Sequence, residues 1–269
     1  MKAQLIDGKR ISAEIKAEAA EEAAALKAKG ITPCLAVVLV GDDSASQVYV
    51  NNKKKACEAV GIRSVSHVLS GGTTEEALLE LIAKLNADKD IHGILVQMPV
   101  PKQIDERKVI LAIDPKKDVD CFHPVNVGNL HTGGEGFLPC TPAGIIELIK
   151  RSGHSIEGKQ CVVIGRSNIV GKPVAMLLMQ ENGTVTICHS KTRNLAEICR
   201  GADIIVSAVG KVNTVTADMV KEGAILIDVG MNRNEAGKLC GDVDFENVKE
   251  IAGAITPVPG GVGPMTIAM

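Results

Sequence analysis

The feature that most constrains the fold is a regular alternation of short runs rich in Val, Ile and Leu with longer stretches of helix-forming residues. Helix formers rich in Ala, Glu and Lys fill residues 12–29 and end at Gly30, a suitable C-terminal cap. We expect strands at residues 34–41, 64–69, 93–99, 161–165, 184–188, 203–210 and 224–230. This alternation is typical of a parallel sheet covered by helices, and it predicts an α/β fold.

Two stretches break the alternation and suggest two domains. Residues 114–140 carry prolines, glycines and histidines without sustained periodicity, which is typical of a crossing between domains. The tail "AITPVPGGVGPMTIAM" is a second irregular stretch. We therefore expect one domain from residues 1–119, completed by the tail 256–269, and a second from residues 120–255 that includes the crossing loop.

Composition excludes several classes of function. The 269 residues are 45% hydrophobic and 23% charged, with 1% aromatic residues and a net charge of −2. Few aromatic side chains and no basic excess argue against a nucleic-acid partner. No signal-peptide pattern or run of 18 apolar residues is present, and the eight cysteines form no CxxC pair. We expect a cytoplasmic protein with free thiols and no membrane partner, and the histidine spacing predicts no metal site.

A nucleotide site is expected where the strand 161–165 ends. The turn that follows reads Gly165-x-Ser167-x-x-x-Gly171, and a helix can begin near Val170. A strand, a glycine-containing turn and a helix amino terminus together form the phosphate site of a Rossmann unit. The pattern lacks the middle glycine of GxGxxG, so by itself it is a weak signal.

The next expected strand, 184–188, indicates which dinucleotide binds. An NAD site usually has Asp or Glu after this strand to accept the ribose 2′-hydroxyl. This chain instead has Ser190, Lys191 and Arg193 there, with Arg166 in the preceding turn. Such donors suit a 2′-phosphate and favour NADP over NAD. The alternative is that Lys191 and Arg193 are ordinary solvated charges.

The run Lys53-Lys54-Lys55 divides by helical phase. At about 100° per residue, Lys53 falls about 40° from Tyr49, on the arc of Cys57 and Val60. The other two lysines fall on the polar side of the same helix. Lys53 can extend its amine to water, or it can enter a cleft, where desolvation lowers a lysine pKa and makes it useful for proton transfer. Tyr49 is either a core aromatic or part of the same site.

Candidate partners for Lys53 follow another strand and begin the crossing. Gln97 lies where the strand "GILVQMP" gives way to prolines, and Asp118 and Asp120 lie in "KKDVDCF". Parallel sheets bind ligands at such strand ends. An aspartate there can accept hydrogen bonds from a heterocycle, or it can cap the loop.

These stretches, in order and spacing, resemble the bifunctional methylenetetrahydrofolate dehydrogenase/cyclohydrolase family. The segments that carry the resemblance, which runs from about residue 4 to the end, are "SQVYVNNKKKACEAVGI", "GILVQMPVP", "KKDVDCFHPVNVG", "CTPAGI", "VVIGRSNIVGKP", "VTICHSKT", "AILIDVGMN" and "ITPVPGGVGPMT". The resemblance implies an amino-terminal folate-binding α/β catalytic domain and a Rossmann-type NADP-binding domain. It also implies oxidation of 5,10-methylenetetrahydrofolate, hydrolysis of the methenyl product to 10-formyltetrahydrofolate, and a homodimer serving one-carbon metabolism and purine biosynthesis.

Carried over position by position, the resemblance also implies roles for individual residues. The implied catalytic residues are Lys53, Tyr49, Gln97 and Asp120. The implied folate contacts are Tyr49, Asp120, Pro259, Gly260 and Gly261, and the implied NADP contacts are Gly165, Arg166, Ser167, Ser190 and Met231. Two positions depart from the family pattern: Cys121 stands where glycine is usual, which can alter the backbone angles of the loop, and Met231 replaces a common isoleucine.

Two rival functions remain open from the sequence. One is a monofunctional NAD(P)-dependent dehydrogenase, with hydride transfer retained and hydrolysis weak. The other is a non-catalytic nucleotide-sensing protein on the same fold, since a fold does not fix function.

Overall fold

The computed structural model describes residues 3–269, apart from the side chains of residues 44 and 45. The chain forms two compact units. Unit 1 comprises Met1–Ala13 and Pro139–Met269, and unit 2 comprises Glu14–Leu138. Helix α1 (Gly8–Ala28) begins in unit 1 and continues into unit 2.

Unit 1 is built on a six-stranded sheet in which every neighbouring pair of strands is parallel. In spatial order the strands are β1 (Gln4–Leu5), β11 (Ala254–Ile255), β8 (Ile225–Asp228), β7 (Ile204–Ser207), β5 (Gln160–Ile164) and β6 (Thr184–Cys188). The chain leaves β5 to form β6 on one side and then crosses to form β7 on the other. The carboxyl ends of β5 and β7 therefore flank a topological switch point, where open α/β sheets bind ligands.

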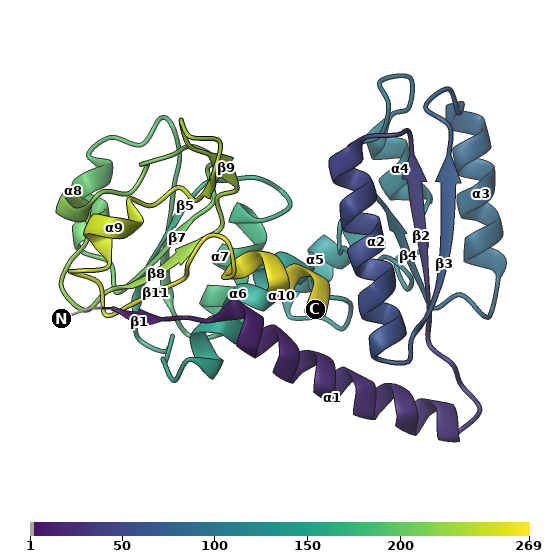
Figure 1. Cartoon of the computed structure of the whole chain (residues 1–269), viewed down its shortest axis with the longest axis horizontal. Helices are drawn as coiled ribbons and strands as arrows, with labels where there is room; N and C mark the ends of the chain where they lie inside the picture. Colours follow the sequence, from purple (N-terminus) through teal and green to yellow (C-terminus); the bar gives the residue numbers. More distant parts are fainter. Residues whose placement is uncertain (1–2) are drawn as a thin grey trace. The chain divides into compact units, whose positions relative to one another are not determined.

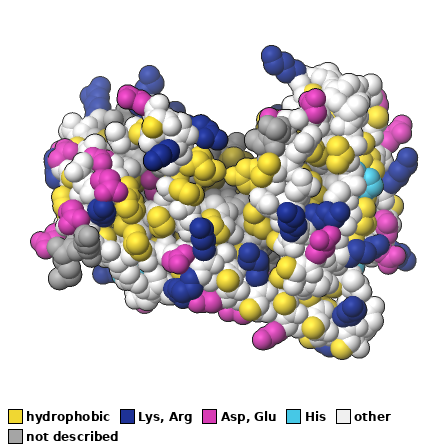
Figure 2. All heavy atoms as spheres, viewed as in Figure 1, with side chains coloured by type: hydrophobic (Ala, Val, Ile, Leu, Met, Phe, Trp, Pro, Cys, Tyr) yellow, Lys and Arg dark blue, Asp and Glu magenta, His cyan; other side chains and the backbone are white. Residues whose placement is uncertain are grey.

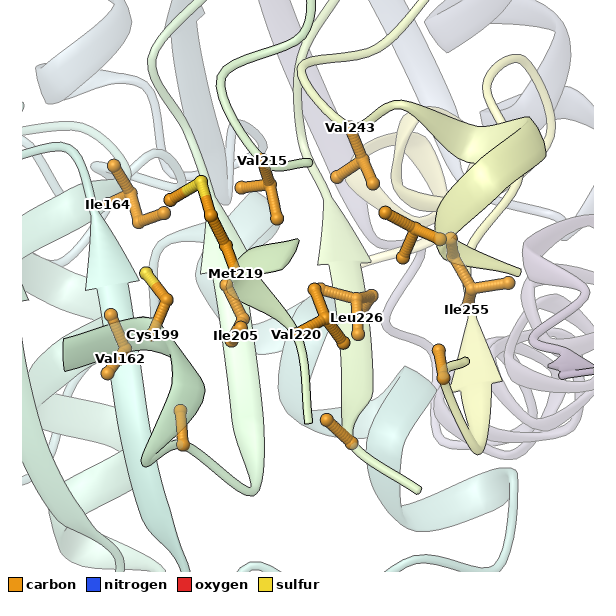
Figure 3. Packing of buried hydrophobic residues seen from close by; sticks show 14 of the residues in the cluster. Val162, Ile164, Cys199, Ile205, Val215, Met219, Val220, Leu226, Val243 and Ile255 are labelled. Atoms are coloured by element: carbon orange, nitrogen blue, oxygen red, sulfur yellow. The ribbon is translucent and has the colours of Figure 1, made fainter. Parts of the chain in front are cut away.

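Short helices and loops cover this sheet. They are α6 (Cys140–Arg151), α7 (Gly171–Gln180), α8 (Leu195–Arg200), the 3-10 helix η1 (Ala217–Met219), α9 (Phe245–Val248) and α10 (Val262–Ala268), with an antiparallel hairpin of β9 (Asn232–Arg233) and β10 (Leu239–Cys240). Figure 3 shows one side of the core, where Val162, Ile205 and Leu226 of neighbouring strands meet Cys199 of α8 and Met219 of η1. The strands are apolar because helices and loops bury them.

Unit 2 has a three-stranded parallel sheet with β2 at its centre (Figure 1). Its elements are β2 (Cys34–Val40), α2 (Ser44–Ala59), β3 (Arg63–Leu69), α3 (Glu75–Ala87), β4 (Gly93–Val96), α4 (Glu106–Ala112) and α5 (Pro124–Thr132). Residue Asp118 forms a parallel bridge with Ile94 and so continues the sheet beyond β4.

The side chains of β2 alternate between two separate cores. Val37 and Leu39 pack with Val50 of α2, whereas Val38 and Val40 belong to the cluster that contains residues of α3 and α4. This two-residue period places α2 on one face of the sheet and α3 with α4 on the other. Unit 2 is therefore a three-layer α/β/α structure.

The expected fold class is confirmed, because both units are α/β with parallel sheets. Two expectations about irregular segments were wrong. The crossing 114–140 contains α5, in which His123 accepts a hydrogen bond from Val125 N and Pro124 occupies the first turn. The tail contains α10. Prolines in a first helical turn do not break a helix, because the N–H groups there have no intrahelical partner.

The compact units also have different bounds from the domains expected from the sequence. Residues 120–138 group with unit 2, and residues 256–269 group with unit 1. The strand β1 joins unit 1 as well, by pairing with β11. That the tail completes the folate-binding domain is a functional statement and stays a prediction.

The surface carries both signs of charge. Figure 2 shows Lys and Arg side chains interspersed with Asp and Glu over the face drawn. Among residues 3–269, no helix is long and apolar enough to cross a membrane.

Candidate active site

Helix α2 presents Lys53 differently from its two neighbours. The helix begins after Asp43, whose carboxylate accepts a hydrogen bond from Ser46 N at 2.8 Å. Lys53 is partly buried, whereas Lys54 and Lys55 are exposed. The amine of Lys54 lies 4.0 Å from Glu58 in an exposed i,i+4 pair. The predicted division of the lysine run between two faces is confirmed.

Gln97 holds the amine of Lys53. Lys53 Nζ donates to Gln97 Oε1 at 3.0 Å, and Gln97 Nε2 donates to Met98 O at 2.9 Å. Gln97 follows β4 directly, and its backbone N–H donates to Val38 O at 2.8 Å. Because its own amide N–H₂ is used on a backbone carbonyl, Gln97 turns its oxygen toward the lysine.

The structure distinguishes the two aspartates that the sequence left equivalent. Asp118 is buried, and its Oδ2 accepts hydrogen bonds from His123 N at 2.8 Å and Asn126 Nδ2 at 2.9 Å, so it caps the loop before α5. The pKa of Asp120 is raised to about 6, mainly by burial; the charge of Asp118 adds to this shift and that of Lys53 opposes it. Asp120 is therefore the carboxyl that interacts with Lys53, and its pKa lies well above the usual range of an aspartate.

Two further residues complete the surroundings of this cluster. Tyr49 lies one turn before Lys53 on α2 and is 38% exposed, so it is not a core aromatic. Cys121 has a φ of 57° and is buried. This left-handed conformation explains why glycine suits the position, and burial raises the thiol pKa to about 11, which keeps it neutral.

The turn after β5 has the close packing that a phosphate site needs. Gly165 has a φ of +123°, and a Cβ there would lie 2.4 Å from Ala208 O, at the switch point between β5 and β7. A Cβ on Gly171 would lie 2.4 Å from Gly165 O. Ser167 Oγ accepts hydrogen bonds from Val170 N and Gly171 N, both at 3.2 Å, at the start of α7. These features fit a dinucleotide phosphate at a helix amino terminus.

The hydrogen-bond donors expected near a 2′-phosphate are at the surface. Arg166, Ser190, Lys191 and Arg193 are all exposed. The loop after β6 is held by hydrogen bonds from His189 N to Thr192 Oγ1 and from Lys191 N to His189 Nδ1. The fixed loop leaves these side chains accessible to a ligand, and their role stays a prediction.

A cavity of about 200 Å³ in unit 1 brings together Pro259, Gly260, Gly261 and Met231. Lys9 and Asp228 also line it. The implied folate contacts in the tail therefore share one cavity with an implied NADP contact. Lys53, Gln97, Asp120 and Tyr49 form the other cluster, in unit 2.

Sequence reasoning missed two buried carboxylates in unit 1, Asp228 at the end of β8 and Asp242 after β10. Burial raises the pKa of Asp228 to about 6, although hydrogen bonds from the backbone of Asp242, Val243 and Gly230 lower it. The available signal was an acid at the end of the apolar run "AILIDVG". Within residues 3–269, no group of three or more His, Cys, Asp or Glu side chains could hold a metal ion.

Comparison with known proteins decides the family. Residues 6–120 match the description "Tetrahydrofolate dehydrogenase/cyclohydrolase, catalytic domain", and residues 139–269 match the corresponding "NAD(P)-binding domain". The chain belongs to the tetrahydrofolate dehydrogenase/cyclohydrolase family. A bifunctional FolD protein of Agathobacter rectalis is 62% identical over 99% of this chain and 96% of its own length.

Solved structures of the family agree with this fold. The bifunctional FolD enzyme of Campylobacter jejuni superposes with a TM-score of 0.96 at 54% identity, covering 99% of this chain and 95% of that one. The Trypanosoma brucei dehydrogenase-cyclohydrolase, complexed with NADP cofactor and inhibitor, has a TM-score of 0.93 at 42% identity, covering 100% and 94%. This tetrahydrofolate dehydrogenase/cyclohydrolase family member therefore shares its fold with bifunctional relatives.

Proposed function

We propose that Lys53, Gln97 and Asp120 are the catalytic residues of a bifunctional enzyme of folate one-carbon metabolism. As a member of its family, the chain is an NADP-dependent methylenetetrahydrofolate dehydrogenase and a methenyltetrahydrofolate cyclohydrolase. It oxidises 5,10-methylenetetrahydrofolate to the methenyl form and hydrolyses that product to 10-formyltetrahydrofolate. The observation that carries the assignment of roles is the 3.0 Å hydrogen bond between Lys53 Nζ and Gln97 Oε1, with Asp120 as the neighbouring charge.

The oxidation places modest demands on the protein. Bound NADP would supply the acceptor for the hydride of the one-carbon bridge. The lone pair of a folate nitrogen stabilises the cation that remains, so the residues need to orient the folate rather than supply a strong base. Tyr49, Asp120, Pro259, Gly260 and Gly261 are proposed to bind the folate. The carboxyl of Asp120 would accept hydrogen bonds from the N–H groups of the heterocycle.

The hydrolysis needs proton transfers, and Lys53 is placed to perform them. Water adds to the amidinium carbon and loses a proton, and the bond to one nitrogen breaks as that nitrogen gains a proton. A neutral Lys53 amine can accept the first proton and return it, while Gln97 fixes the amine in position. Both reactions use the same bound folate, which accounts for two activities at one site.

The test compares Lys53→Met with Lys54→Met. General acid–base catalysis contributes about 10²–10⁴-fold, so Lys53→Met should lower methenyl hydrolysis by at least about a hundredfold. Lys54→Met should change it little, because Lys54 lies on the exposed face of α2 and pairs there with the exposed Glu58. The absorbances of methenyltetrahydrofolate and NADPH, followed together, report the two steps.

Three results would contradict the proposal. Equal losses of methenyl hydrolysis in Lys53→Met and Lys54→Met would show that the helix face on which Lys53 lies does not matter. Wild-type enzyme that stalls at methenyltetrahydrofolate would be a monofunctional dehydrogenase. Tight NADP binding without any turnover would indicate a nucleotide-sensing protein.

For the cofactor, we propose that Gly165, Arg166, Ser167, Ser190 and Met231 contact NADP. The close packing of Gly165 against Ala208 and the start of α7 after Ser167 support this placement. The exposed donors Arg166 and Ser190 are available for the 2′-phosphate.

We also propose that the protein is a homodimer in the cytoplasm and contributes 10-formyltetrahydrofolate to purine biosynthesis. These properties follow from the family resemblance. Light scattering of the purified protein measures the oligomeric state, and a monomer mass at assay concentration would contradict the dimer.

A further inference from the structure

In unit 1, the buried carboxylate of Asp242 accepts several hydrogen bonds. Its side chain is fully buried. Its oxygens accept five hydrogen bonds, Oδ2 from Ser207 Oγ (3.1 Å), Val209 N (2.8 Å) and Gly210 N (3.2 Å), and Oδ1 from Lys211 N (2.9 Å) and Asn232 Nδ2 (2.9 Å). Burying a carboxylate is costly unless such partners compensate it, and here most of them are backbone groups of one loop.

A second carboxylate and the core fix the position of Asp242 itself. Asp242 N donates to Asp228 Oδ1 and Val243 N donates to Asp228 Oδ2, both at 2.9 Å. The side chain of Val243 is buried in the core, and its backbone forms a bridge with Val215 (Figure 3). The carboxylate of Asp242 is therefore held on a rigid support.

Two glycines allow the backbone to come this close. A Cβ on Gly230 would lie 2.2 Å from Asp242 Oδ1, and a Cβ on Gly241 would lie 1.8 Å from Asp228 Oδ2. Side chains at these positions would displace the carboxylates. The sequence thus combines two buried acids with two glycines in one arrangement.

Both chain segments that Asp242 contacts border the expected ligand site. The loop after β7 carries Ala208, whose carbonyl packs against Gly165 at the switch point. The segment after β8 carries Gly230 and Met231, which line the cavity of about 200 Å³. Asp242 itself is shielded from solvent, so it can act on a ligand only through these segments.

We propose that Asp242 is a positioning residue for the dinucleotide: its carboxylate holds residues 207–211 and 230–232 in the shape that binds the cofactor. The inference rests on the proposed placement of NADP at the turn of Gly165 and Ser167. Hydrogen bonds formed in advance lower the ordering cost of binding, so loss of this carboxylate weakens affinity without removing a direct contact.

The decisive variant is Asp242→Asn, which keeps the shape and changes one oxygen into an N–H donor. In either orientation the new N–H₂ group meets backbone donors, Val209 N and Gly210 N on one side or Lys211 N on the other. We expect the Kd for NADPH, measured by its own fluorescence, to rise at least about tenfold, or about 1.4 kcal/mol. Amide hydrogen exchange of residues 208–211 should accelerate, and the KM for NADP should rise more than kcat falls.

Asp203→Asn is the matched control. Asp203 accepts a hydrogen bond from Gln160 N at 2.7 Å and pairs with Lys221 at 2.6 Å, at the amino ends of β5 and β7. It directly precedes β7 and lies at the amino ends of the strands, opposite the switch point at their carboxyl ends. The control should lower the denaturation temperature and leave the Kd for NADPH unchanged.

The outcomes separate this inference from the proposed function. The inference about Asp242 would be overturned if Asp242→Asn kept the wild-type affinity for NADPH and the wild-type rate of amide hydrogen exchange. It would also be overturned if Asp203→Asn lost as much affinity for NADPH as Asp242→Asn. If Asp242→Asn does not fold, Ser207→Ala decides, because it removes one of the five donors and should raise the Kd about threefold; an unchanged Kd would then overturn the inference. If Arg166→Ala and Ser167→Ala bind NADPH normally, the placement of the cofactor is wrong instead.

Discussion

Asp120→Asn should give a protein that is more stable near neutral pH and inactive. Burial raises the pKa of Asp120 from 3.8 to about 6, so the folded protein binds a proton there more tightly than the unfolded chain does. Above that pKa the partly buried charge destabilises the fold. The shift corresponds to at most about 3 kcal/mol, which the neutral asparagine would recover.

The sign of the pH dependence follows from the same shift. Stability decreases as pH rises wherever the folded state holds more protons than the unfolded state, here between about pH 4 and pH 6. The gain in the free energy of unfolding of Asp120→Asn over wild type should therefore be complete near pH 8, fall to about half near pH 5 and nearly vanish near pH 4. Both catalytic activities should be lost, because Lys53 loses its carboxyl neighbour and the folate its proposed acceptor.

Urea denaturation followed by circular dichroism measures the effect, since the chain has no tryptophan. Asp42→Asn, an exposed change in the same unit, serves as the control and should stay within about 0.5 kcal/mol at each pH. An Asp120→Asn protein that is less stable than wild type near pH 8 would refute the reasoning. A gain of equal size near pH 8 and near pH 5 would do so as well, because the cause would then not be the charge.

Three further predictions concern the loops. Because Cys121 has a φ of 57°, Cys121→Gly should be more stable in urea than Cys121→Ala by about 0.5–1 kcal/mol, and the reverse order would exclude backbone strain. Gly165→Ala should weaken NADPH binding at least about tenfold in a fluorescence titration, since its Cβ would lie 2.4 Å from Ala208 O; normal binding would show that this turn is adaptable. Arg166→Ala should raise the KM for NADP by about tenfold more than that for NAD in steady-state assays, and an unchanged ratio would count against its contact with the 2′-phosphate.

The repeating parts of the fold were predictable because their signals are local. Apolar runs marked the three strands of the unit 2 sheet and strands β5 to β8 of the unit 1 sheet, and helical phase separated Lys53 from Lys54 before any contact was known. Helix α5 was missed because its glycine and its proline were interpreted as breakers. His123 as the cap and Pro124 in the first turn are in fact a helix start.

The remaining features depend on contacts that no local pattern contains. Asp118 and Asp120 are two residues apart and chemically identical, and only the position of Asn126 and Lys53 around them decides which one caps a loop. The strand β1 is two residues long, and its role comes from β11 at the other end of the chain. The hydrogen bonds around Asp242 likewise join segments that only the folded sheet brings together.

The pairing of β1 with β11 also has a consequence for synthesis on the ribosome. Unit 2 is continuous in the chain, so it emerges whole after residue 138 and its parallel sheet can form early. The edge of the unit 1 sheet cannot close until β11 emerges, because Gln4 pairs with Ala254. Contacts this distant in sequence form slowly. A strand translated before all of unit 2 is thus among the last to reach its place, and a nascent-chain pulse-labelling experiment should find Gln4–Leu5 protected only after β11 has left the exit tunnel.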